Sequence, residues 1–139
     1  MQETISFQIM VLYRDFLSYT TRALKEYGVN FGQMPLILYM GKHAGCRQAE
    51  LKQDLHLDWG YSQRSISKLV EDGLVRKDYD PALSCNRLTL TERGQMVFDT
   101  CHDVFQSWDQ LQTGRLTRQE ADRLLELLCK LSPEGKESR

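Results

Sequence analysis

The segment from residue 59 to residue 73 constrains the fold of this chain more than any other stretch. At helical spacing, Ile66, Leu69 and Val70 form a narrow apolar seam, which predicts a helix that packs along one side only. Arg64 and Lys68 are four residues apart, so both cations project from the same face. Gly73 then ends the predicted helix, and an extended run begins at residue 74.

The polar side of this helix has the composition of a surface that enters a DNA groove. Arginine and glutamine can reach base edges, whereas serine, tyrosine and lysine hold phosphates. Acidic side chains are absent from this segment until Glu71. We therefore expect DNA contacts from the polar residues of the helix, which are Tyr61, Ser62, Gln63, Arg64, Ser65, Ser67 and Lys68.

The flanking sequence predicts a helix-turn-helix followed by a wing. A short helix is expected over residues 47–55 and a turn over 56–58, where Asp58 can cap the next helix. Such a pair could also be an ordinary helical hairpin. Predicted strands over 74–80 and 86–90 decide in favour of a winged helix, with Arg76, Lys77 and Arg87 placed to touch the DNA backbone.

Long helices are predicted on both sides of this core. Apolar residues at spacings of three and four indicate a helix over 3–27 that ends at Gly28, and a second helix is expected over 33–43. Thr91 opens another long helix. Thr117 and Glu120 form a capping box at the start of the last one. The fold class is therefore mainly α, with a small β component.

Composition limits the remaining classes of function. The 139 residues suit a single domain with 41% hydrophobic and 27% charged residues, and we expect a cytoplasmic protein because no apolar run approaches the roughly 20 residues of a membrane span. A net charge of −1 argues against indiscriminate coating of nucleic acid. The four cysteines show no CxxC spacing, so free thiols are expected rather than a zinc or dithiol site.

The run from Gln48-Ala49-Glu50-Leu51 through Gly73-Leu74-Val75 to Leu90-Thr91-Glu92-Arg93-Gly94 resembles the MarR family of bacterial winged-helix regulators. The resemblance covers nearly the whole chain. It implies a homodimer that reads a pseudo-palindromic site in double-stranded DNA. The implied plan has a winged core over 31–94, dimerisation helices over 1–30 and 95–132, and a disordered tail over 133–139. Exposed apolar stripes on the long helices also favour a dimer.

The predicted wing departs from the family pattern. Members usually carry an Asp-x-Arg or Asp-Arg-Arg cluster there, whereas this chain has Asp80-Pro81-Ala82-Leu83-Ser84-Cys85-Asn86-Arg87. Gly60 also replaces a usual serine. Each lost groove or phosphate contact should weaken binding and flatten its salt dependence. An alternative is therefore a winged-helix protein-interaction module that has lost operator binding and modulates another regulator.

The sequence has no feature of an enzyme and calls for no cofactor. His43, His56 and His102 lie in separate predicted elements, so no metal site is expected. Cys85 in the wing is a redox-sensor candidate without a cationic setting that would favour its thiolate. By resemblance, a small aromatic effector would bind between the dimer helices and the core. Its candidate contacts, which could equally be packing residues, are Tyr13, Phe16, Tyr19, Phe31 and Tyr39.

Overall fold

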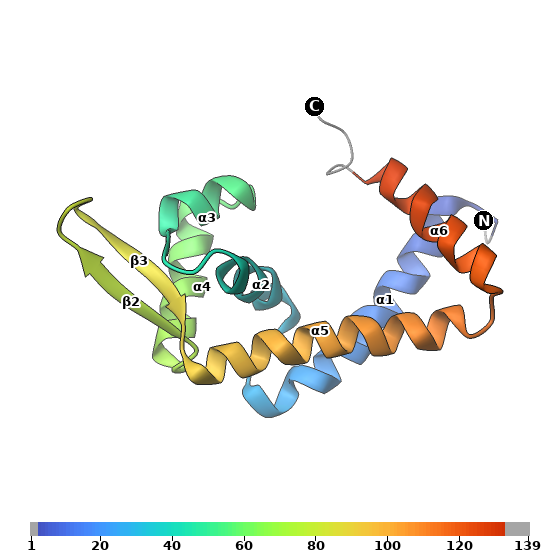
Figure 1. Cartoon of the computed structure of the whole chain (residues 1–139), viewed down its shortest axis with the longest axis horizontal. Helices are drawn as coiled ribbons and strands as arrows, with labels where there is room; N and C mark the ends of the chain where they lie inside the picture. Colours follow the sequence, from blue (N-terminus) through green and yellow to red (C-terminus); the bar gives the residue numbers. More distant parts are fainter. Residues whose placement is uncertain (1–2, 133–139) are drawn as a thin grey trace. The chain divides into compact units, whose positions relative to one another are not determined.

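The computed structural model describes residues 3–132, so the tail expected over 133–139 lies outside the described residues. The helices and strands follow one another in the order of a winged helix flanked by longer helices (Figure 1). Their bounds are α1 Ile5–Leu24, η1 Lys25–Tyr27, η2 Phe31–Gln33, α2 Met34–Lys42, β1 Cys46–Arg47, α3 Gln48–Asp54, α4 Trp59–Glu71, β2 Val75–Asp80, β3 Cys85–Leu90, α5 Glu92–Thr113 and α6 Arg118–Leu131.

Helix ends fall where the sequence has capping residues. Asp58 accepts a hydrogen bond from the backbone N–H of Tyr61 at the start of α4. Thr117 and Glu120 form the predicted capping box of α6. Gly28 adopts the left-handed conformation, with φ of 69°, just after η1. These predicted boundaries are confirmed to within one or two residues because each depends on side chains close to it in sequence.

The chain divides into two compact units, Met1–Val104 and Phe105–Arg139, with the boundary inside α5. The first unit contains the hydrophobic core. Side chains from α2, α3, α4, the sheet and the beginning of α5 are almost completely excluded from solvent there. They include Leu36, Ile37, Met40, Leu51, Ile66, Leu69, Leu74, Leu88, Val97 and Cys101.

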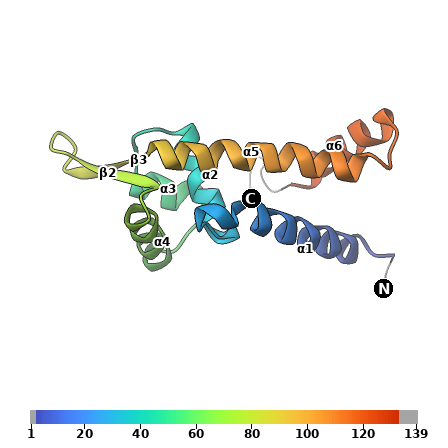
Figure 2. The same ribbon diagram turned by 90° about the horizontal axis from the view of Figure 1, so that it is seen from below.

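The sheet has three antiparallel strands in the order β1-β3-β2, whereas the sequence predicted two. The additional strand pairs Cys46 with Leu88 and Arg47 with Arg87. A strand of two residues is too short to show an alternating pattern, so local sequence could not indicate it. The β2–β3 hairpin projects beyond α3 and α4 in both views of the chain, as a wing does (Figures 1 and 2).

The base of the wing is fastened to the beginning of α5. Thr91 donates its backbone N–H to the carbonyl of Leu74 and its hydroxyl to the carbonyl of Gly73. A Cβ atom at Gly94 would lie 2.0 Å from the Leu74 carbonyl oxygen, so only glycine allows this approach. The hairpin is therefore anchored to the same hydrophobic core against which α4 packs.

The second unit consists of the end of α5 and α6. None of the residues of α6 is buried. Leu125 is 65% exposed, and four further leucines of this helix, Leu124, Leu127, Leu128 and Leu131, are also exposed. In the first unit, the N-terminal half of α1 likewise presents exposed apolar residues, which are Ile5, Ile9, Met10, Val11, Leu12 and Tyr13. Over residues 3–132, none of the helices combines the length and apolar character that crossing a membrane requires.

Candidate nucleic-acid interface

Helix α4 presents a polar face away from the core. Ile66 and Leu69 are completely buried beneath it. Gln63, Arg64, Ser67 and Lys68 are exposed on the other side. Val70, which the sequence placed in the apolar seam, lies at its edge and is 36% exposed. The helix therefore uses one narrow side for packing and leaves a row of hydrogen-bonding side chains open to solvent.

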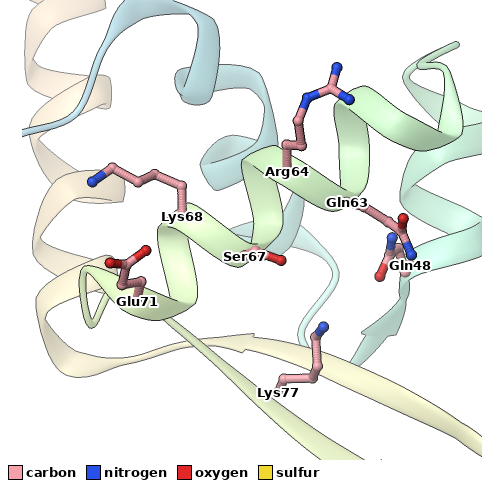
Figure 3. A pocket seen from close by; sticks show the side chains of 7 residues that line it. All are labelled: Gln48, Gln63, Arg64, Ser67, Lys68, Glu71 and Lys77. Atoms are coloured by element: carbon pink, nitrogen blue, oxygen red, sulfur yellow. The ribbon is translucent and has the colours of Figure 1, made fainter.

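This polar face borders a cavity of about 570 Å³ (Figure 3). α3, α4 and β2 contribute its lining, which consists of Gln48, Gln63, Arg64, Ser67, Lys68, Glu71 and Lys77. Three of these side chains are cationic and one is a carboxylate, so the lining has a net positive charge. One of the cations, Lys68, also pairs with Asp72, with 3.2 Å between Nζ and Oδ1. Amide and hydroxyl groups beside the cations add hydrogen-bonding capacity. A surface of this kind suits phosphates and base edges.

Gln48 belongs to this cavity, although the sequence analysis did not name it as a contact. It is the first residue of α3. Its Nε2 atom is buried, and the part of the chain that the structure describes offers that atom no hydrogen-bond partner. An amide donor left unpaired at the wall of a cationic cavity is a candidate contact. Its position at a helix start was the one available sequence signal, and it is not specific.

Two of the predicted contacts on α4 are buried or only partly exposed, and the hydroxyl of a third is already hydrogen-bonded. Ser62 is completely buried, and its hydroxyl donates to the carbonyl of Trp59, so the prediction that Ser62 contacts DNA is wrong for this conformation. Ser65 is only partly exposed. Tyr61 is exposed, but its hydroxyl donates to the carbonyl of Gly32 and ties α4 to η2. The inward side of α4 therefore includes position 62 as well as positions 66 and 69.

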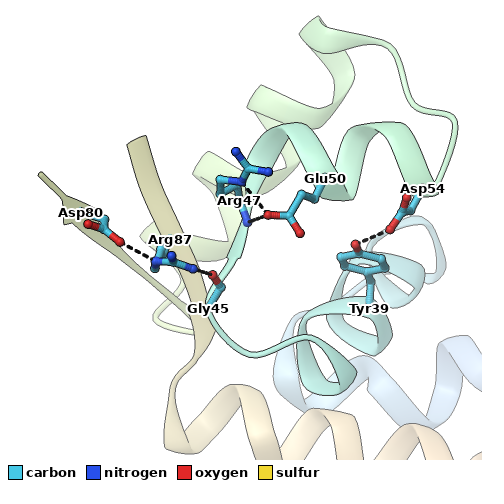
Figure 4. A network of polar contacts seen from close by, with 7 residues as sticks. All are labelled: Tyr39, Gly45, Arg47, Glu50, Asp54, Asp80 and Arg87. Atoms are coloured by element: carbon cyan, nitrogen blue, oxygen red, sulfur yellow. Dashed lines mark hydrogen bonds and ion pairs between the residues drawn. The ribbon is translucent and has the colours of Figure 1, made fainter. Parts of the chain in front are cut away.

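The wing holds its two arginines in ion pairs. Arg87 donates Nε to Asp80 and Nη1 to the carbonyl of Gly45, which joins the hairpin to the segment before β1 (Figure 4). The hydrogen bond from Arg87 lowers the pKa of Asp80. Arg76 pairs with Asp78, with 2.7 Å between Nε and Oδ2. Lys77 is the one of the three predicted wing cations that lines the cavity beside α4.

Comparison with known proteins identifies the family. The chain is 32% identical over 132 residues to the HTH-type transcriptional regulator BilQ of Clostridium symbiosum, an alignment that covers 94% of this chain and 92% of that protein. A MarR transcriptional regulator from Methanosarcina mazei has the same fold, with a TM-score of 0.77 and 26% identity over 92% of this chain and 86% of its own. The chain belongs to the MarR family. No family model matches the sequence.

Another solved MarR-family structure is a mutant MarR from E. coli complexed with operator DNA. It superposes with a TM-score of 0.76 and 25% identity, covering 95% of this chain and 97% of its own. The predicted winged helix-turn-helix fold is therefore confirmed. In its general class, this protein is a DNA-binding transcriptional regulator. The individual contact residues stay predictions.

The aromatic residues predicted to hold an effector in this MarR-family chain fall into separate groups. Phe31 makes edge-to-face contacts with Tyr13 and Phe16, at centroid distances of 5.8 and 5.9 Å. Tyr19 is partly exposed on α1. Tyr39 is buried, and its hydroxyl donates to Asp54, a hydrogen bond that raises its pKa (Figure 4). The structure therefore brings three of the five rings together and engages Tyr39 elsewhere.

The cysteines and histidines offer no second candidate site in residues 3–132. Burial raises the pKa of Cys46 and of Cys101 to about 11, so these thiols are poor nucleophiles near neutral pH. Cys85 is partly exposed at the start of β3. No group of three or more potential metal ligands occurs within the described residues. The cationic cavity beside α4 is therefore the site on which a function can be argued.

Proposed function

We propose that this protein is a sequence-specific DNA-binding regulator that inserts α4 into the major groove. The observation that carries the proposal is the cationic cavity formed by α3, α4 and Lys77. A relative of the same fold has been solved with operator DNA. Recognition helices of helix-turn-helix proteins read base edges in the major groove, and contacts to phosphates fix their register. A regulator of this kind works where the DNA is, so the proposal includes a cytoplasmic location.

The residues take different roles in this proposal. Gln63 and Arg64 read base edges, because their planar amide and guanidinium groups can form paired hydrogen bonds with purines. Ser67 and Lys68 hold phosphates, and Gln48 and Lys77 add phosphate contacts from the two sides of the cavity. Tyr61 and Ser65 help to position α4, whereas Arg76 and Arg87 stabilise the wing through their ion pairs.

We further propose a homodimer assembled through the terminal helices. The exposed leucines of α6 and the exposed apolar residues of α1 are the support, because a monomer rarely leaves such surfaces in water. In a two-fold dimer, each subunit would present one α4 to the DNA. The half-sites would then lie about 10 base pairs apart or a multiple of that spacing, which makes the operator pseudo-palindromic.

A small aromatic ligand is proposed to release the DNA. The support is the cluster of Tyr13, Phe16 and Phe31, whose edge-to-face geometry suits the addition of another flat ring. Tyr19 on α1 could add its hydroxyl. Tyr39 is less suited to contact the ligand, because its hydroxyl already donates to Asp54. A ligand that binds better to the DNA-free conformation would shift the protein away from the operator.

Fluorescence anisotropy with the protein's own upstream DNA tests the proposal. Titrations at several salt concentrations, with scrambled DNA as competitor, separate specific from non-specific binding. Binding that survives the competitor and weakens steeply with salt is the expected result. Equal, weak binding to both DNAs would contradict the proposal.

The second candidate function is a protein-interaction module that modulates another regulator. The observation that favours it is the state of the wing, where both arginines are paired with carboxylates and the loop lacks the family's usual cation cluster. This candidate predicts no specific DNA binding. It also predicts that a regulator bound to the purified protein would be released by substitutions on α4, for example Arg64→Ala.

A further inference from the structure

The two faces of the wing hairpin differ in charge and in what they adjoin. Directly opposite residues of antiparallel strands share a face, as do alternate residues along one strand. Lys77 is opposite Leu88, and Tyr79 is opposite Asn86. These four side chains therefore belong to one face of the hairpin. Leu88 is completely buried in the core and Lys77 lines the cavity beside α4, so this is the face on the side of α4.

The opposite face carries Arg76 and Arg87, two of the three wing cations that the sequence predicted as DNA contacts. Arg76 pairs with Asp78 and Arg87 pairs with Asp80, each with 2.7 Å between the charged atoms. Arg87 also donates to the carbonyl of Gly45. Each cation is thus matched by a carboxylate on the same face, which leaves little net positive charge for a phosphate. The carboxylate beside each arginine therefore opposes the approach of a phosphate to this face.

Tyr79 and Asn86 extend the α4-side face outward from the cavity. Tyr79 is 64% exposed and Asn86 is also exposed. Within residues 3–132, neither side chain has a hydrogen-bond partner, so a phenol hydroxyl and a carboxamide are both available. Tyr79 is two residues beyond Lys77, which corresponds to about 6–7 Å along a strand. That distance is similar to the spacing of successive phosphates on one DNA strand.

We propose that the wing of this protein contacts the DNA backbone through the uncharged pair Tyr79 and Asn86, in place of arginines. The inference rests on the proposed function, because it assumes that Lys77 and α4 face duplex DNA. A tyrosine hydroxyl and an asparagine amide both donate hydrogen bonds to phosphate oxygens. These contacts release no counterion, so they add affinity without adding to the salt dependence of binding.

The experiment compares the salt dependence of DNA binding among wing variants of the full chain. The probe is the protein's own upstream DNA, measured by anisotropy at several salt concentrations. We expect Tyr79→Phe and Asn86→Ala each to weaken binding about 3- to 10-fold at every salt concentration with an unchanged slope, because one hydrogen bond and no charge is lost. Lys77→Ala should reduce the slope by about 1.

Two further variants keep the test independent of stability. Arg76→Ala, the matched substitution on the opposite face, should change affinity less than about 2-fold, as surface substitutions away from a contact do. Asn86→Lys should tighten binding and raise the slope by about 1, because a new cation would meet a phosphate. A gain of binding of this kind cannot come from misfolding.

The outcomes separate the inference from the function beneath it. If the parent binds its DNA specifically and the Tyr79→Phe and Asn86→Ala variants bind equally well, the inference is overturned and the proposed function stands. A reduced slope in Arg76→Ala would also overturn it, since the charged face would then be the contact. Failure of the parent to bind its DNA specifically would overturn the proposed function, and the wing assignment with it.

Discussion

Helices α4 and α6 are nearly equal in length and both are amphipathic. α4 buries its apolar side, whereas α6 leaves its apolar side exposed. α4 has 13 residues and α6 has 14, and each begins with a side-chain cap, Asp58 in one and Thr117 in the other. The apolar seam of α4 is completely buried at Ile66 and Leu69. In α6, Leu125 is 65% exposed and no residue is buried.

The difference shows how an amphipathic helix acquires a role. α4 has satisfied its apolar side within its own unit, so the polar side remains for a partner that offers hydrogen bonds and negative charge. In α6 the exposed side is apolar, so it would be stabilised by packing against another apolar surface. In the proposed homodimer, a second copy of the chain would supply such a surface.

The first prediction concerns the apolar face of α6. Leu125→Asp should dissociate the proposed homodimer, because burial of one leucine contributes about 1.5–3 kcal/mol and a two-fold interface contains it twice, about 3–6 kcal/mol in all. Sedimentation equilibrium measures the effect. Leu83→Asp, at an exposed leucine of the wing, is the matched control and should leave the dimer intact. A dimer unaffected by Leu125→Asp would mean that α6 is not in the interface.

The second prediction concerns the buried side of α4. Leu69→Ala should lower the free energy of unfolding by about 2–5 kcal/mol, since it leaves a cavity in the core. Val70→Ala on the same helix should cost less than about 1 kcal/mol, because Val70 is partly exposed. Urea unfolding followed by circular dichroism measures both. Equal losses for the two variants would contradict the assignment of the inward side.

The third prediction concerns the open side of α4. Arg64→Ala should cost about 1–3 kcal/mol in binding to the specific DNA, if its guanidinium reads a base edge. In the described part of the chain, that guanidinium makes no ion pair, so its removal should leave stability almost unchanged. Anisotropy and urea unfolding on the same preparation separate the two effects. Parent-like affinity in Arg64→Ala would remove α4 from the proposed DNA interface.

The fourth prediction concerns the pH dependence of the wing. The pKa of Asp80 is lowered by its hydrogen bond with Arg87, so the pair stabilises the hairpin at pH values above the unfolded pKa, about 3.9. This contribution is lost as the pH falls from that value through the folded pKa. Hydrogen exchange of the wing amides should therefore show reduced protection below about pH 4. Arg87→Gln should reduce this transition, because Asp80 would keep its hydrogen bond from the backbone N–H of Ala82. A transition of unchanged size would assign it to another carboxyl group.

The sequence determined those features whose causes lie within a few residues. The capping of α4 by Asp58 and the capping box of α6 follow from side chains that bond to backbone N–H groups three residues away. The periodicity of apolar residues gave the helices, and the run from Gly73 to Gly94 gave the wing and the family. The cations of α4 and Lys77 could be named for the same reason, since a helix and a strand fix which side chains share a face.

Only the tertiary structure decided the orientation of each element about its own axis. Ser62 is buried and Val70 is partly exposed because α4 is rotated so that positions 62, 66 and 69 face the core, and that rotation depends on packing against other elements. Gln48 reaches the cavity because α3 crosses beside α4 and β2. Arg87 pairs diagonally with Asp80 on the neighbouring strand, although Asp78 is the residue directly opposite it. Packing and pairing between different elements set each of these outcomes, and no pattern within a single element encodes them.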